Sequence, residues 1–190
     1  MNPPDSPRER IIHRIVDLEW KMFSTVKARE PAACQEEEGT FRLMRWMSHS
    51  VYSDLLLDML ASHLETATTA GRNLMTEKYA RMEDLIPPLR TSPLIPYILA
   101  AETAWMADLG RRYPLTFPGT GERFGAYLAA ELETWPEDAL ERYAAEVGTA
   151  QATGANLVEA RYTNLFRRLG DPDLEAREHR TRLGMFRCAQ

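Results

Sequence analysis

The chain has 190 residues, a hydrophobic content of 44% that is ordinary for a globular protein, and a formal net charge of −5. The acidic balance argues against nucleic acid as a partner, because phosphates require a basic surface. Two cysteines are too few for a disulfide framework. The most apolar window, residues 94–109, is interrupted by Glu102 and is too short to span a bilayer, and the N-terminus lacks the apolar segment of a signal peptide. We therefore expect a cytoplasmic protein without nucleic-acid or membrane partners.

Apolar residues recur at three- and four-residue steps along most of the chain, which predicts helices. In the second predicted helix, Phe41, Met44 and Met47 are expected to face inward. Ser53 is typical of an N-cap, and Pro136 suits the first position of a helix. No stretch shows strand-like alternation, so the expected fold class is all-α. In chain order, the expected helices cover residues 7–29, 36–50, 53–84, 93–112, 120–134, 136–169 and 172–183.

Two segments of the chain are similar to each other. Residues 10–86 align with residues 93–169 at a constant offset of 83 and without a gap, most clearly where TATTAGRNL is matched by TAQATGANL. Internal repeats indicate a repeated structural unit. We therefore predict one helical domain, 1–190, in which two three-helix repeats are merged into one bundle. Repeat one covers residues 7–86, the linker 87–92 and repeat two 93–169, and the C-terminal helix 172–183 has no counterpart.

The duplication sorts residues by role. Residues that both copies keep are expected to be structural, and residues that only one copy has are candidates for function. Gly71 and Gly154 interrupt the long helices 53–84 and 136–169 at the same place, which predicts a close helix crossing or a local break.

Glu19 and Glu102 occupy equivalent positions on the apolar faces of their helices. A buried carboxylate requires a partner or a raised pKa. The expected partners recur in step with the glutamates: Asn73, Lys78 and Tyr79 in the first copy, and Asn156, Arg161 and Tyr162 in the second. One interpretation is a duplicated structural network. The alternative is a pair of facing carboxylates that do acid–base or metal work, with Glu19 as the candidate catalytic group.

Several polar residues, among them Arg72, Glu77 and Arg81, occur only in the first copy, and Lys78, which the second copy matches with Arg161, lies near them. Arg72, Lys78 and Arg81 are close enough along the chain to clamp a carboxylate or phosphate together. Cys34, just before a predicted helix, is either a small packed thiol or a second catalytic candidate. The histidines have no metal-ligand spacing, so neither a metal nor a cofactor is predicted. The candidate ligand site comprises Arg72, Asn73, Glu77, Lys78, Tyr79, Arg81, Trp20 and Gln35.

Several stretches resemble one known family. They are EWKMF (19–23), Cys34 with Gln35, and GRNLMTEKYARM (71–82), and the second half agrees through Trp105, Tyr113 and GANL (154–157). The chain is similar over nearly its whole length to the uncharacterised bacterial domain-of-unknown-function family 4125. This resemblance implies no activity.

Three functional hypotheses follow. The first is binding of a small polar or anionic molecule at the candidate ligand site. The second is an enzyme that uses buried Glu19. The third is a protein-interaction module, homo-oligomeric or not, whose polar networks are purely structural.

Overall fold

The computed structural model describes residues 6–26, 37–119 and 121–188. Within these ranges the chain forms nine helices and no strand, which confirms the predicted all-α class. The helices are α1 (Pro7–Phe23), α3 (Glu38–His49), α4 (Asp54–Thr69), α5 (Leu74–Met82), α6 (Leu94–Arg112), α7 (Gly121–Glu133), α8 (Glu137–Thr153), α9 (Leu157–Arg168) and α10 (Leu174–Cys188).

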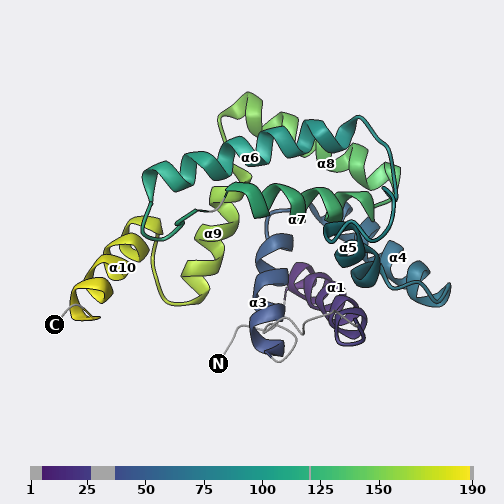
Figure 1. The fold of residues 1–190 in the computed structure, drawn as a ribbon, viewed down its shortest axis with the longest axis horizontal. Helices are drawn as coiled ribbons and strands as arrows, with labels where there is room; N and C mark the ends of the chain where they lie inside the picture. Colours follow the sequence, from purple (N-terminus) through teal and green to yellow (C-terminus); the bar gives the residue numbers. More distant parts are fainter. Residues whose placement is uncertain (1–5, 27–36, 120, 189–190) are drawn as a thin grey trace.

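The helices pack in two similar sets. Helix α1 contacts α3, α4 and α5, and α6 contacts α7, α8 and α9. Between the sets, α5 contacts α7, α3 contacts α9, and α4 contacts α8. In Figure 1, α6 and α8 run along one long edge of the molecule, and α7 lies between them and α1 and α3. Helix starts at residues 38, 54 and 74 return at 121, 137 and 157, each 83 residues later. These boundaries fit the offset, and the common origin of the two halves stays a prediction.

Each of the helices expected at 53–84 and 136–169 is divided into two, so a single helix over these bounds is wrong and the local break predicted at Gly71 and Gly154 is confirmed. Gly71 and Gly154 both have a φ of +71°, the left-handed conformation that ends many helices. The Arg72 N–H donates to the Ala67 carbonyl and the Ala155 N–H to the Ala150 carbonyl, both at 2.8 Å, which closes the helix ends. A close crossing at these glycines is also wrong, because no atom lies within 4 Å of the place a Cβ would occupy.

Asparagine starts the next helix after each break. The Asn73 side-chain oxygen accepts from the Thr76 N–H at 2.9 Å, and the Asn156 oxygen accepts from the Glu159 N–H at 2.8 Å. The amide of Asn73 also donates to the Met22 carbonyl at 2.8 Å, which fastens α5 to the end of α1. Each asparagine therefore accepts a hydrogen bond from an otherwise unpaired N–H in the first turn of α5 or α9. It thereby fixes where the new helix starts relative to the preceding one.

The inward face of α3 differs from the one expected. Phe41 and Met47 are buried as predicted, but Met44 is 40% exposed and Arg45 is buried in its stead. Phe41 stacks on Phe23 of α1 with ring centroids 4.6 Å apart, which fixes the two helices against each other. A charged residue consequently enters the core from α3.

The remaining predicted boundaries are close to those observed. The expected helix 7–29 ends at Phe23, and its residues 27–29 lie outside the described residues. The C-terminal helix begins at Leu174 rather than 172, and it packs on α9. None of the helices in the described part of the chain combines the length and the apolar character needed to cross a membrane. The cytoplasmic location stays a prediction.

Candidate functional site

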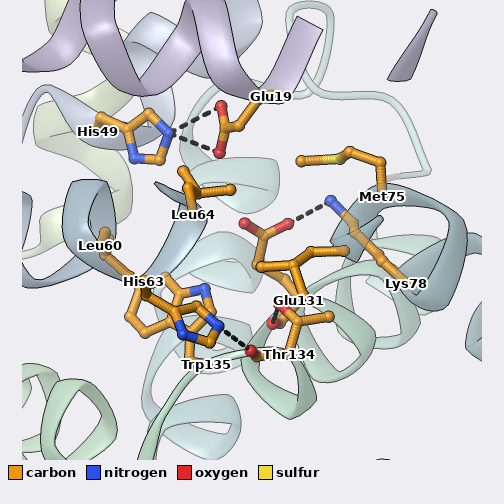
Figure 2. Close-up of a pocket in the computed structure, with 11 residues that line it drawn as sticks. Glu19, His49, Leu60, His63, Leu64, Met75, Lys78, Glu131, Thr134 and Trp135 are labelled. Carbon is orange, nitrogen blue, oxygen red and sulfur yellow. Dashed lines mark hydrogen bonds and ion pairs between the residues drawn. The ribbon is translucent and has the colours of Figure 1, made fainter. Parts of the chain in front are cut away.

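Glu19 is held by two side chains of α3. The Arg45 Nε–H donates to Oε2 at 2.8 Å and Nη2 to Oε1 at 2.5 Å, while His49 Nε2 lies 3.0 and 3.1 Å from the two oxygens (Figure 2). Since a carboxylate only accepts, His49 Nε2 is the donor. Arg45 and His49 are four residues apart and therefore share one helix face. Burial raises the pKa of Glu19, but Arg45 and His49 outweigh it and lower the pKa to about 2. The carboxylate is thus held ionised.

The same arginine continues the network into α7. Arg45 donates to both carboxylate oxygens of Glu131, at 2.6 and 3.2 Å, and to the Tyr127 hydroxyl at 3.2 Å. Lys78 of α5 also donates to Glu131 (Figure 2), and its Nζ lies 3.4 Å from the centre of the Tyr127 ring. Burial raises the pKa of Glu131, and the two cations overcome this and lower it. Four helices therefore meet at one buried set of charges.

A second buried network surrounds Glu102 on α6. Arg161 of α9 donates to both carboxylate oxygens, at 2.6 and 2.8 Å, and the Tyr143 hydroxyl of α8 donates to one of them. In the second half, the positions that match Arg45 and His49 are occupied by Leu128 and Leu132. At these positions α7 therefore has no polar side chain for Glu102, whereas α3 has two for Glu19. Tyrosine and arginine supply the donors instead.

A small cavity lies beside the Glu19 network. It has a volume of about 20 Å³ and is lined by side chains that include Glu19, His49, His63, Lys78 and Glu131 (Figure 2). The His63 Nε2–H donates to the Thr134 carbonyl at 2.8 Å. A polar cavity of roughly 10–15 Å³ or more can hold one water molecule, so this space suits a single buried water.

A larger pocket shares Glu131 with the small cavity and is also lined by Arg45. We call it the α3–α9 pocket, because α3, α6, α7 and α9 provide most of its lining. Its volume is about 470 Å³. The charged side chains that line it are Arg45, Glu131, Glu102 and Arg161, so both buried networks reach this pocket. The other lining residues are Met44, Met47, Ser48, Tyr52, Met106, Pro118, Gly119, Phe124, Tyr127, Leu128, Val158 and Tyr162.

The predicted burial of the two glutamates is confirmed, and only one of the predicted partners is right. Glu19 and Glu102 are 3% and 0% exposed. Arg161 binds Glu102 as expected. Lys78 binds Glu131 rather than Glu19, and Asn73 and Asn156 cap helices. The glutamates do not face each other as a pair, because each has partners of its own.

The predicted tyrosines instead pack against rings. Tyr79 lies 5.5 Å from Phe23 between ring centroids, and Tyr162 lies 4.7 Å from Phe117.

The structure does not bring the cations of the expected clamp to one point. Arg72 pairs with Glu77, at 3.0 and 2.7 Å, on the surface of α5. Arg81 pairs with Glu133 at 2.6 Å, while Lys78 is buried. Each of the three cations is thus paired with a different carboxylate, so they do not form a joint clamp.

Of the remaining candidates from the first copy, Trp20 lies within the described residues. The Trp20 ring lies 5.3 Å from that of Phe41. Cys34 and Gln35 lie outside the described residues. Their role in ligand binding or catalysis stays a prediction.

Sequence reasoning missed four residues that bind the buried charges, and two of them, Arg45 and Glu131, join the halves. Arg45, His49, Glu131 and Tyr143 each bind a buried charge, and none has a matching residue in the other copy. Phe41, Arg45 and His49 follow at four-residue steps, and this pattern would have placed Arg45 and His49 on the inward face. Among the described residues, no cluster of three or more His, Cys, Asp or Glu side chains could hold a metal ion.

Comparison with known proteins identifies the family. A family described as "Protein of unknown function (DUF4125)" matches residues 9–179, and the chain belongs to this family. No curated protein and no solved structure matches it.

Proposed function

We propose that this DUF4125 protein binds a small, largely apolar molecule in the α3–α9 pocket. The observation that carries the proposal is the pocket itself. Its volume of about 470 Å³ falls in the range of roughly 300–1,000 Å³ that is common for small-molecule sites. Methionine and aromatic side chains provide much of the lining, and a few charged groups converge at one part of it. This combination of an apolar wall and few polar groups is typical of a ligand site.

The state of the charged groups favours binding over acid–base catalysis. Glu19 has a pKa of about 2, and both of its carboxylate oxygens already accept hydrogen bonds from Arg45 and His49. A general acid or base requires a pKa near the working pH. Glu131 has a lowered pKa, with Arg45 and Lys78 as its partners. A carboxylate that is fixed in this way orders the pocket rather than exchanging protons.

The proposed site differs from the one expected from the sequence. The cations of the first-repeat cluster are already neutralised by Glu77, Glu133 and Glu131, which weakens the case for an anionic ligand there. The α3–α9 pocket lies instead between the two halves, where Arg45 and Arg161 come from different halves.

The test uses N-phenyl-1-naphthylamine, an uncharged dye that fluoresces in apolar sites. We expect saturable binding to the protein. Phe124→Ala removes a half-buried ring from the pocket lining and should weaken binding about tenfold, which corresponds to roughly 1.4 kcal/mol. Leu55→Ala is the matched control, because Leu55 is 55% exposed and lies outside the pocket. Absence of binding, or equal loss in both variants, would reject the proposal.

A further inference from the structure

Tyr52 occupies the turn between α3 and α4 and lines the α3–α9 pocket. Its side chain is fixed by other rings. Trp135 meets it at an interplanar angle of 90° with centroids 5.7 Å apart, and Tyr143 meets it at 70° and 5.0 Å. The residue is only 4% exposed. Its ring is therefore held in one orientation by the core.

The hydroxyl of this buried tyrosine has no hydrogen-bond partner among the described residues. A buried tyrosine hydroxyl normally has one, because an unmade hydrogen bond is costly. Other unpaired polar atoms are completely enclosed by protein atoms, but the Tyr52 hydroxyl oxygen is not one of these. Tyr52 lines the pocket and its hydroxyl is not fully enclosed, so we take the pocket as the side on which the hydroxyl is open. A molecule in the pocket could supply the missing partner.

The neighbouring carboxylates do not need the Tyr52 proton. Glu131 already accepts from Arg45 and Lys78, and Glu102 accepts from Arg161 and Tyr143. Burial, together with the charges of Glu102 and Glu131, raises the pKa of Tyr52, so the hydroxyl remains a donor at neutral pH.

Another unused donor lies nearby, but protein atoms enclose it completely. Arg161 employs its Nη1 and Nη2 groups, while its Nε–H has no partner among the described residues. Of these two groups, the Tyr52 hydroxyl is therefore the unused donor that protein atoms do not enclose.

The charges around the pocket also cancel. Among the residues that line it, Arg45 and Arg161 balance Glu102 and Glu131, and all four side chains are buried. A ligand with a net charge would find no unbalanced counter-ion in this lining to offset the loss of its own hydration, which is unfavourable. The group that best fits the Tyr52 hydroxyl is therefore an uncharged oxygen acceptor.

We propose that Tyr52 is a specificity-determining residue of the α3–α9 pocket, which donates a hydrogen bond to the carbonyl oxygen of an uncharged, otherwise apolar ligand. This inference rests on the proposed function and narrows its ligand to one chemical class. The aromatic and methionine lining accommodates the apolar body, and the Tyr52 hydroxyl selects the carbonyl.

The experiment compares three probes of one size: 4-phenylbutan-2-one, n-butylbenzene and 4-phenylbutanoate. Affinities are measured by ligand-observed NMR titration. The ketone should bind about three- to tenfold more tightly than butylbenzene, the effect of one hydrogen bond, and more tightly than the carboxylate. Tyr52→Phe should abolish the preference for the ketone and leave the affinity for butylbenzene unchanged. Tyr97→Phe, at an exposed tyrosine outside the pocket, should leave both unchanged.

The outcomes separate the two proposals. If no probe binds, the proposed function fails and the role of Tyr52 fails with it. If butylbenzene binds but the ketone has no advantage, or keeps its advantage in Tyr52→Phe, only the role of Tyr52 is rejected. Tighter binding of the carboxylate rejects an uncharged ligand. The melting temperature of Tyr52→Phe should not fall, since the lost hydroxyl has no protein partner, and a marked fall would also contradict the assignment.

Discussion

Replacing Glu19 with glutamine should make the stability of the protein less sensitive to acid. Glutamine keeps the shape of the side chain but cannot ionise. In the native protein the pKa of Glu19 is about 2, against 4.5 for an ordinary glutamate. That difference corresponds to about 3 kcal/mol of stability, and because Glu19 is 3% exposed, solvent screening reduces it little.

The sign follows from the lowered pKa. The unfolded chain takes up the proton first as the pH falls, so the contribution of Glu19 is complete above about pH 5 and declines as the pH falls towards 2. Between pH 7 and pH 3, the native protein should lose about 2 kcal/mol through Glu19 alone. Glu131 and other carboxylates add to this loss, but they remain in the variant. The stability difference between native protein and Glu19→Gln should therefore shrink from about 3 kcal/mol at pH 7 to about 1 kcal/mol at pH 3.

The measurement is urea unfolding, followed by circular dichroism, at intervals from pH 3 to pH 7. Asp58→Asn serves as the control, because Asp58 is exposed on α4 and makes no ion pair with any described residue. The control should follow the native curve closely. A constant difference between native protein and Glu19→Gln across this range would refute the reasoning, since it would mean that Glu19 does not titrate with a lowered pKa.

Three further predictions concern stability and can be checked by thermal melts. Glu19→Leu should melt at a higher temperature than Glu19→Ala, because leucine fills the buried space while alanine leaves a cavity beside Arg45; equal melting temperatures would contradict this. Asn73→Ala should cost about 1–2 kcal/mol through the lost helix cap, and Arg72→Ala less than about 0.5 kcal/mol because its ion pair is on the surface; the reverse order would be inconsistent with the contacts. Gly71→Ala should destabilise by about 1 kcal/mol because of its positive φ, whereas Gly39→Ala inside α3 should stabilise by up to about 1 kcal/mol; effects of the same sign would show that the backbone conformation is not the cause.

Local patterns determined much of the fold. The spacing of apolar residues predicted the helical class and placed Glu19 and Glu102 in the core, because a residue on the apolar stripe of a helix is buried wherever that stripe packs. The breaks in the two long helices were predicted only as one of two alternatives at the glycines. The pair of a glycine and an asparagine two residues later, Gly71 with Asn73, carried that signal, since glycine ends a helix and asparagine starts one.

Only the tertiary structure decided which charges meet. Arg45 bridges Glu19 and Glu131, residues that are 26 and 86 positions away from it in the chain. Spacing within one helix cannot specify such contacts, because they depend on how α3 and α7 are brought together. The α3–α9 pocket and the unpaired Tyr52 hydroxyl have the same origin: both exist where helices from the two halves leave space between them, and no single helix encodes that space.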